Sequence, residues 1–310
     1  MIRVDDGRSV LEYELEGDSA VLTGFEGSDL VCFVPESITA GDKDYPVTTV
    51  AKKALLNSPF REISLPSCIR DIGDWAFSKS IHLKTFNVRG SLEDTGVIRL
   101  GKGILEGTTG LESVSFGYTE PDDLSFLTAL CAGKLPAAFL LRTDNLGTKE
   151  WYESFDASLE AFLKEEDDAT FLPDILCGEE DISYDGVGMV DGEMPGETPA
   201  YIRKKREEKA AVCLTRLLRA TGMAEDKRVS FSEYVKEHSL GTKDPSAWEA
   251  IKHELNMDME YVKVYCDVTN PDKSMRDRML RDMGKSGPEV KAFLLAGADD
   301  GTDFFDELRL

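Results

Sequence analysis

The stretches VTTVAKKALLNSPFREISLP (Val47–Pro66) and IRDIGDWAFSKSIHLKTFNV (Ile69–Val88) carry the same pattern of apolar residues. The pattern returns at a shift of 22 to 23 residues, a period typical of repeat proteins. The matched pairs are Val47 with Ile69, Val50 with Ile72, Ala54 with Ala76, Leu55 with Phe77, Phe60 with Leu83, Ile63 with Phe86 and Leu65 with Val88. A repeat predicts stacked units that display a surface, but it does not identify the ligand.

A third copy follows after an insertion. It matches the second copy at an offset of 28, so about five residues are added near Gly90 to Gly96. Its apolar residues are Val97, Leu100, Ile104, Leu105, Leu111, Val114 and Phe116. Because no single unit can close a core, we expect each to add a short strand backed by a turn. Stacking the units would then bury a continuous apolar ladder.

This pattern resembles the BspA-type (treponema-type) leucine-rich repeat, I-x-x-I-x-x-x-A-F-x-x-x-x-x-L-x-x-V-x-I-P. The residues that carry the resemblance are Ile69, Ile72, Ala76, Phe77, Leu83, Phe86 and Val88, with Leu65-Pro66 one repeat earlier. Residues 22–27, 31–35 and 45–47 look like the opening turn of such an array. The resemblance covers Leu11 to Gly117. It implies a coil of roughly four strands in a bacterial protein that recognises other proteins.

Strand residues that alternate with the core should point outward. In leucine-rich repeats this outward face is the usual ligand surface, as the resemblance implies. Here the outward residues are Val31, Phe33, Glu62, Ser64, Thr85, Asn87, Arg89, Ser113 and Ser115. They are mostly small and polar, so the sequence lacks the Trp, Tyr and Arg clustering of a binding hot spot. Because the insertion follows Arg89, we expect a ligand near residues 89–96, across the junction with the helices.

Charge narrows the class of partner. The 310 residues carry a net charge of −23, of which −6 lies up to Gly117 and −17 after it. A chain this acidic disfavours nucleic acid and anionic membrane surfaces and favours a protein partner. Residues 1–17 show no export signal, and no segment is apolar enough to cross a bilayer, so no membrane insertion is expected.

Six scattered cysteines without a C-x-x-C pair suggest buried free thiols and a cytoplasmic protein. They are Cys32, Cys68, Cys131, Cys177, Cys213 and Cys266. A secreted or cell-surface location is the alternative, if an export signal preceded this sequence.

After Gly117 the apolar period becomes helical. We expect helices at 121–131, 149–163 and near 169–176, while residues 136–141 fit either a strand or a buried turn. Residues 178–198 hold five glycines and seven carboxylates and read as a flexible acidic linker. This segment does not match a calcium-binding EF-hand loop. If Asp185 were the first ligand, the third and fifth positions would be Val187 and Met189, which have no side-chain oxygen.

Further helices are expected at 199–221, 230–238, 244–255, 258–267, 271–284 and 288–296. Their starts are marked by Thr198-Pro199, Asp244-Pro245, Asn270-Pro271 and a capping box from Ser230 to Glu233. The basic run Arg203–Arg206 precedes two glutamates and is interpreted as a solvated helix face. Glu289–Asp299 resembles the second helix of an ankyrin repeat, although the T-P-L-H-x-A opening is missing. The resemblance implies paired helices.

No motif for catalysis is complete. The histidines are His82, His238 and His253, and Met257 stands where an H-E-x-x-H motif beginning at His253 would need its second histidine. Gly101-Lys102-Gly103 is too short for a phosphate loop. We therefore expect no catalytic residue, no metal and no cofactor.

The sequence thus predicts an α+β protein in four segments: a leucine-rich-repeat solenoid (1–117), a helical connector (118–177), an acidic linker (178–198) and an all-α helical-hairpin domain (199–310). Its predicted role is a non-enzymatic protein–protein interaction module or scaffold. A secreted or cell-surface adhesin of the BspA type and a hydrolase with a site in the helical region are the alternatives. The oligomeric state stays open.

Overall fold

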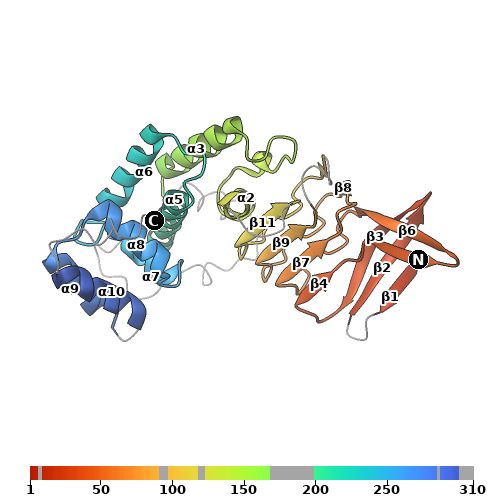
Figure 1. Ribbon diagram of the computed structural model, residues 1–310, viewed down its shortest axis with the longest axis horizontal. Helices are drawn as coiled ribbons and strands as arrows, with labels where there is room; N and C mark the ends of the chain where they lie inside the picture. Colours follow the sequence, from red (N-terminus) through yellow and green to blue (C-terminus); the bar gives the residue numbers. More distant parts are fainter. Residues whose placement is uncertain (6–8, 91–96, 118–122, 168–198, 285–286, 300–310) are drawn as a thin grey trace, which may run out of the picture. The chain divides into compact units, whose positions relative to one another are not determined.

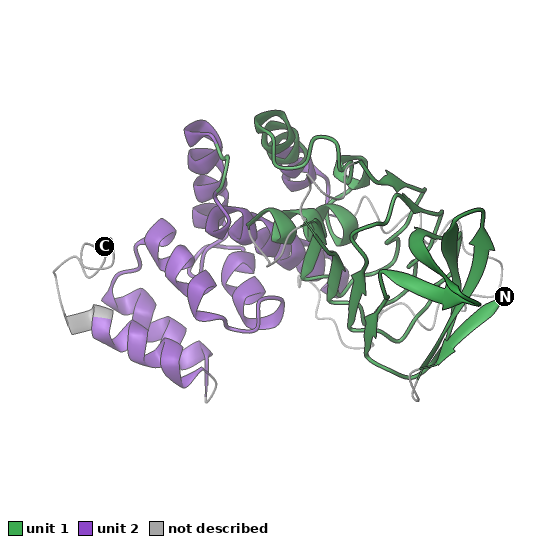
Figure 2. Cartoon of the chain, turned by 45° about the vertical axis from the view of Figure 1, so that its right-hand side comes forward, with its two compact units in different colours: residues 1–158, 221–223 green, residues 159–220, 224–310 purple. Residues whose placement is uncertain are grey.

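The computed structural model of the chain describes residues 1–5, 9–90, 97–117, 123–167, 199–284 and 287–299. The chain forms two compact units (Figure 2), Met1–Ser158 with Thr221–Met223 and Leu159–Ala220 with Ala224–Leu310. Strands and helices are both present, which confirms the α+β class. The linker at 178–198 and the helix expected near 169–176 lie outside the described residues, and the four segment boundaries stay predictions.

The first sheet joins an antiparallel N-terminal part to a parallel ladder. Strands β1, β2 and β3 pair antiparallel, β3, β6, β8 and β10 pair parallel, and β5 pairs antiparallel with β6. The strands are β1 (Ile2–Asp5), β2 (Ser9–Glu16), β3 (Ser19–Gly27), β5 (Ser37–Ala40), β6 (Lys43–Val50), β8 (Asp71–Ile72) and β10 (Arg99–Leu100). Residues 22–27 and 45–47 therefore lie in strands β3 and β6, whereas the sequence predicts an opening turn.

The second sheet is wholly parallel and has the order β11-β9-β7-β4 (Figure 1). Its strands are β4 (Val31–Phe33), β7 (Glu62–Leu65), β9 (Thr85–Val88) and β11 (Ser113–Phe116). Each repeat forms one coil: a strand of the first sheet, a turn, then a strand of the second sheet. Coil 1 holds β6 and β7, coil 2 holds β8 and β9, and coil 3 holds β10 and β11.

The predicted apolar ladder forms the core of these coils. Strand pairing places Ile63, Phe86 and Val114 in one row, and all three side chains are buried. Val97 is an exception, because its side chain is 65% exposed while that of Ile98 is 3% exposed. The N–H of Ile98 donates to Oγ1 of Thr143 at 3.0 Å, so coil 3 presents Ile98 to the interior instead. The prediction that Val97 is a core residue was wrong.

The helical segments described between β11 and residue 167 are α2 (Asp123–Gly133), the short 3₁₀ helix η1 (Ala138–Leu140) and α3 (Lys149–Lys164). Helix α2 packs against β11, the last strand of the second sheet. Residues 136–141, unassigned from the sequence, thus contain a single helical turn. The predicted amphipathic helix is confirmed: the Trp151 and Phe155 side chains are fully buried, and the Trp151 indole N–H donates to the carbonyl of Leu140 at 2.9 Å.

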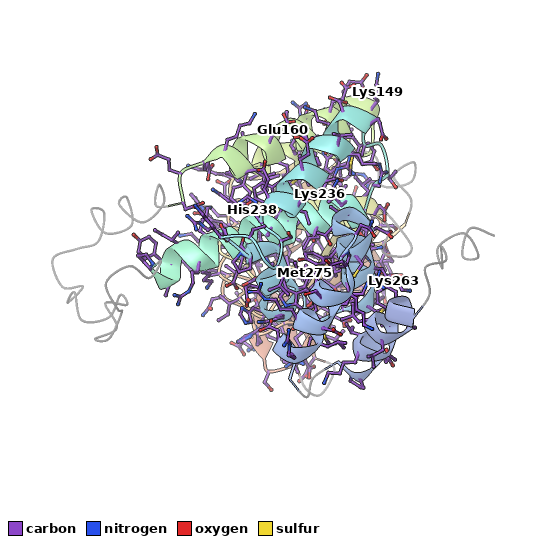
Figure 3. All side chains as sticks on the ribbon, turned by 90° about the vertical axis from the view of Figure 1, so that its left-hand side faces the viewer. Lys149, Glu160, Lys236, His238, Lys263 and Met275 are labelled. Carbon is purple, nitrogen blue, oxygen red and sulfur yellow. The ribbon has the colours of Figure 1, made fainter. Side chains whose placement is uncertain are left out.

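In the second unit, helix α5 packs against α6, α7 and α8. Figure 3 shows this helical region with its side chains, including Lys236 and His238 at the end of α6. The helices are α5 (Ala200–Leu218), α6 (Glu225–Glu237), α7 (Ser246–His253), α8 (Met259–Thr269), α9 (Lys273–Asp282) and α10 (Pro288–Asp299). Every helix predicted after residue 198 has a counterpart here. The ankyrin-like reading of the last helices stays a prediction.

Two predicted helix starts were wrong. Helix α6 begins at Glu225, so Ser230 and Glu233 lie inside it and form no capping box. Asn270 ends α8 in the left-handed conformation, with φ of 44°, because an asparagine tolerates this geometry at a helix C-terminus. The cap of α9 is Asp272, whose carboxylate accepts from the N–H of Met275 at 2.7 Å.

Candidate functional site

The outward face of the second sheet holds the predicted site residues in two rows. Strand pairing aligns Val31, Glu62, Thr85 and Ser113 in the first row and Phe33, Ser64, Asn87 and Ser115 in the second. Because side chains alternate along a strand, both rows face away from the buried ladder. The structure thus brings the predicted residues together on one face. Whether a ligand binds there stays a prediction.

Exposure falls along this face from β4 to β11. Val31 and Phe33 on β4 are 59% and 63% exposed, whereas the β7 and β9 residues Ser64, Thr85 and Asn87 are half-buried. Ser113 and Ser115 are each only 6% exposed, on the strand against which α2 packs. The prediction that these two serines offer an exposed surface was therefore wrong. The open part of the face lies on β4, β7 and β9.

Arg89 follows β9 and reaches back across the two preceding strands. Its Nη1 donates to the Ser64 carbonyl at 3.1 Å and its Nη2 donates to the Val34 carbonyl at 2.7 Å. The guanidinium also pairs with Glu36, at 3.1 Å from Nε and 2.8 Å from Nη2 to the same carboxylate oxygen. One side chain, 19% exposed, thus joins three neighbouring strands.

Arg89 also stacks on Phe33. The guanidinium carbon lies 4.0 Å from the centre of the ring, within the range of a cation–π contact. Arg89 therefore orients an aromatic side chain whose surface is mostly exposed. The sequence suggested that this face lacks hot-spot clustering, but the folded chain does place an arginine and an aromatic residue together.

Glu36 completes the network and was missed from the sequence. Its carboxylate accepts from the backbone N–H of Ser67 at 3.0 Å and from the Ser67 hydroxyl at 3.0 Å. Partial burial alone would raise the pKa of Glu36, but the hydrogen bonds from Arg89 and Ser67 outweigh it and lower the pKa. No repeat position signals Glu36, because it lies in the segment after β4, before the first copy of the repeat begins. Residues 91–96, expected near the ligand, lie outside the described residues.

A second charged network lies in the helical unit. Asp167 accepts from Nζ of Lys209 at 2.8 Å and from Nε of Arg206 at 2.7 Å. Lys209 is 2% exposed, and Arg206 also pairs with Asp244 at 3.3 Å. Burial opposes ionisation of Asp167, but the hydrogen bonds from Lys209 and Arg206 prevail, so its pKa is lowered. The prediction of a solvated basic face was therefore wrong for Arg206, because its guanidinium forms ion pairs with Asp167 and Asp244.

His253 and its neighbours on α7 form hydrogen bonds with carboxylates of the same unit. Its Nδ1 lies 2.9 Å from a carboxylate oxygen of Glu207. On the same helix, Nζ of Lys252 donates to Asp282 at 2.8 Å, and the Trp248 indole N–H donates to the same oxygen at 2.8 Å. These contacts tie α7 to α5 and α9. Within the described ranges no three His, Cys, Asp or Glu side chains form a group that could hold a metal ion.

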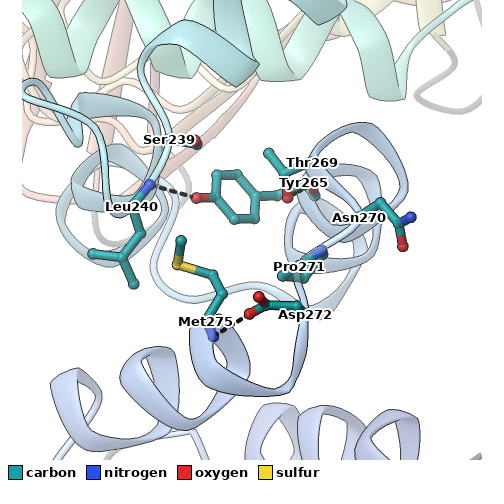
Figure 4. A pocket seen from close by; sticks show the side chains of 8 residues that line it. All are labelled: Ser239, Leu240, Tyr265, Thr269, Asn270, Pro271, Asp272 and Met275. Atoms are coloured by element: carbon teal, nitrogen blue, oxygen red, sulfur yellow. Dashed lines mark hydrogen bonds between the residues drawn. The ribbon is translucent and has the colours of Figure 1, made fainter.

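A pocket of about 240 Å³ lies beside α8 and α9 (Figure 4). It is lined by Ser239, Leu240, Tyr265, Thr269, Asn270, Pro271, Asp272 and Met275. Its polar groups serve the fold: the Tyr265 hydroxyl accepts from the Leu240 N–H at 2.8 Å, and Asp272 caps α9. The hydroxyls of Ser239 and Thr269 likewise donate to the backbone carbonyls of Lys236 at 2.8 Å and Tyr265 at 2.7 Å.

The five described cysteines form no disulfide with one another, and four of them are buried as predicted, whereas Cys68 is only half-buried. Burial raises the pKa of Cys266 to about 12. Cys177 lies outside the described residues. Among the helices that the structure describes, none combines the length and the apolar character needed to cross a bilayer.

Comparisons with known proteins identify no family profile and no curated protein that matches this chain. Solved structures of leucine-rich-repeat proteins are similar to part of it, and three of them are described below. A leucine-rich cell surface protein from Faecalibacterium prausnitzii A2-165 is 19% identical, over 36% of this chain and 29% of that one, with a TM-score of 0.29. A leucine-rich-repeat protein from Bacteroides capillosus ATCC 29799 is 17% identical, over 38% and 83%, with a TM-score of 0.30.

The leucine-rich-repeat protein of T. pallidum is 22% identical, over 34% of this chain and 47% of that one, with a TM-score of 0.27. The match thus spans less than half the length of the T. pallidum protein and less than a third of the F. prausnitzii one. The resemblance to leucine-rich-repeat proteins that the sequence predicted is confirmed.

Proposed function

We propose that this chain is a protein-recognition module of the leucine-rich-repeat solenoid type. Its partner contacts the strand face, defined as the outward side chains Val31, Phe33, Ser64, Asn87 and Arg89. The observation that carries the proposal is the contact between Phe33 and Arg89, where an exposed aromatic ring is fixed by an arginine. Aromatic residues, phenylalanine included, and arginines are enriched in the buried core of protein interfaces.

The fixed geometry of this pair favours binding. Arg89 is held by two backbone carbonyls and by Glu36, so it loses little side-chain freedom when a partner arrives. Ser64 lies next to Phe33 in strand register and Asn87 lies next to Ser64, and these small half-buried side chains leave room for a partner's side chain. The strand face therefore offers a rigid apolar contact beside polar groups.

Affinity capture with the full chain tests this proposal. Wild-type protein and the variants Phe33→Ala and Ile81→Ala are immobilised separately and incubated with a cell lysate. The proteins that each form retains are identified by mass spectrometry. Ile81 is the matched control, because it is 57% exposed but lies outside the second sheet. We expect a protein that wild type and Ile81→Ala retain and Phe33→Ala loses.

A titration of that purified protein against the three forms then measures the affinities. We expect Phe33→Ala to weaken binding by about tenfold or more, as for a hot-spot residue. Equal retention by all three forms, or no retained protein at all, would reject the strand face as the recognition surface. Circular dichroism melts of the variants establish that each is folded.

A further inference from the structure

The turns of the three coils form a surface of their own, away from the strand face. We define the turn surface as residues 51–57, 73–79 and 101–107. Neighbouring turns are joined by backbone hydrogen bonds, such as Lys53 N–H to the Asp74 carbonyl at 3.0 Å and Trp75 N–H to the Lys102 carbonyl at 2.9 Å. Equivalent residues therefore lie side by side along the stacked coils.

One row of this surface has left-handed backbone geometry. Lys53, Trp75 and Gly103 occupy equivalent positions, with φ of 58°, 52° and 59°. Glycine adopts this conformation freely, whereas a bulky side chain pays roughly 1 kcal/mol or more. The hydrogen bonds between turns hold Trp75 there in spite of that cost. The chain thus keeps a large aromatic residue at a position that suits glycine.

The neighbouring coil makes room for this tryptophan. A Cβ atom added to Gly103 would lie 2.9 Å from Cδ1 of Trp75, so the glycine accommodates the ring. The Trp75 indole N–H donates to the Glu106 carboxylate at 3.2 Å, which fixes the ring orientation. Trp75 is half-buried, whereas Trp151 and Trp248 are fully buried. Trp75 is therefore the tryptophan that can contact a ligand.

Lysines gather around this ring. The Nζ atoms of Lys52 and Lys53 lie 5.0 Å and 5.6 Å from the ring centre, and the exposed Lys79 and Lys102 lie on the second and third turns of the turn surface. In the part of the chain that the structure describes, none of these four lysines forms an ion pair with a carboxylate. The turn surface contains only two acidic residues, Asp74 and Glu106. It is thus locally cationic in a chain of net charge −23.

We propose that the turn surface binds an acidic peptide segment of a partner protein. Lys52 and Lys53 bring two ammonium groups to one indole ring without a carboxylate of their own, and a carboxylate of the ligand would relieve their mutual repulsion. An apolar side chain of the peptide packs against Trp75 and Leu56, which is 40% exposed. The turn surface is separate from the strand face, so this proposal does not depend on the proposed function.

The small size of the cationic area favours a peptide over a long polyanion. A nucleic acid or sulfated polysaccharide extends beyond four lysines and would meet the acidic remainder of the chain. A short segment with a few carboxylates interacts only with the turn surface. The Asp74 carboxylate accepts from the backbone N–H of Lys102 at 2.8 Å and forms no ion pair with the four lysine ammonium groups in the described part of the chain.

Fluorescence titration of the full chain tests this inference. The probes are an octapeptide of glutamate and leucine, the matching octapeptide of lysine and leucine, and heparin. We expect the glutamate peptide to bind saturably and change the Trp75 emission, and the double variant Lys52→Gln/Lys53→Gln to bind about tenfold more weakly. Lys52→Arg/Lys53→Arg should retain binding. Arg61→Gln, an exposed change on coil 1 outside the turn surface, is the charge control and should bind like wild type.

Three outcomes would overturn the proposal. The first is no saturable binding of the glutamate peptide. The second is an equal loss of binding in Arg61→Gln and Lys52→Gln/Lys53→Gln, which would indicate general charge attraction. The third is tight binding of heparin together with weak binding of the peptide, which would assign the surface to a polyanionic glycan. The substituted lysines are exposed, and circular dichroism establishes that each variant is folded.

Discussion

Arg89 stacks on Phe33, with its guanidinium carbon 4.0 Å from the ring centre, while the same side chain bonds to the carbonyls of Val34 and Ser64. The contact therefore has two roles. It connects β4 and β7 to the residue that follows β9, and it orients the exposed aromatic ring of the strand face. Stability and recognition should respond together when this arginine is changed.

Arg89→Ala should destabilise the first of the two compact units, which contains the stacked coils. The substitution removes an ion pair, a cation–π contact and two bonds to half-buried carbonyls, so we expect a loss of roughly 1–3 kcal/mol in unfolding free energy. Urea denaturation monitored by circular dichroism measures this. Arg99→Ala is the control: Arg99 is 81% exposed and pairs with Asp71 at 2.8 Å, so its loss should cost less than about 1 kcal/mol. Equal effects of the two variants would contradict the structural role of Arg89.

Glu36 should make stability depend on pH under acidic conditions. Its pKa is lowered in the folded chain, so its contribution is complete above the unfolded-state pKa of about 4.3 and is lost as the pH falls through the folded-state value. Glu36→Gln should therefore be less stable than wild type at pH 7, and the difference should shrink below about pH 4. Urea melts from pH 7 to pH 3 measure it. A difference that stays constant with pH would contradict the lowered pKa.

Asp167→Asn should destabilise the helical unit. It leaves the ammonium group of the buried Lys209 without its carboxylate, and breaking a buried pair is strongly destabilising. Because Asp167 is 25% exposed, we expect about 2–3 kcal/mol, below the value for a fully buried pair. Adding Lys209→Met should recover part of this loss. If the double variant is no more stable than Asp167→Asn, the charge of Lys209 is not the cause.

Gly101→Ala should disrupt the stacking of coils 2 and 3. A Cβ atom at Gly101 would lie 2.5 Å from the backbone N of Asp74, which cannot move without shifting the coil. We expect a cost of roughly 1–3 kcal/mol, as for overpacking. Gly24→Ala is the matched control, because its Cβ would meet the flexible carboxylate of Glu12 at 2.9 Å, and it should cost much less. Thermal melts compare the two. Similar melting temperatures for both variants would show that coils 2 and 3 can move apart without a loss of stability.

Several features were predictable because they depend on neighbours in the chain. The apolar period indicated which side chains form the buried ladder, and strand alternation indicated that Glu62, Ser64, Thr85 and Asn87 share a face. Helical spacing around Trp151 predicted α3 almost to the residue. Errors arose where a contact from elsewhere changed the local pattern. The hydroxyl of Thr143 accepts from the N–H of Ile98, and Ile98 is buried where the sequence predicted Val97. Helix α2 packs against β11, so Ser113 and Ser115 on that strand are buried.

The sequence by itself determined the repeat core, because 22-residue spacing and alternation of side chains are properties of the chain and its backbone geometry. Only the tertiary structure decided the surfaces. Phe33, Glu36 and Arg89 meet because three strands stack in register, and Lys52 and Lys53 surround Trp75 because neighbouring turns are joined by hydrogen bonds. Contacts between coils depend on the register of stacking, which no local pattern of residues encodes.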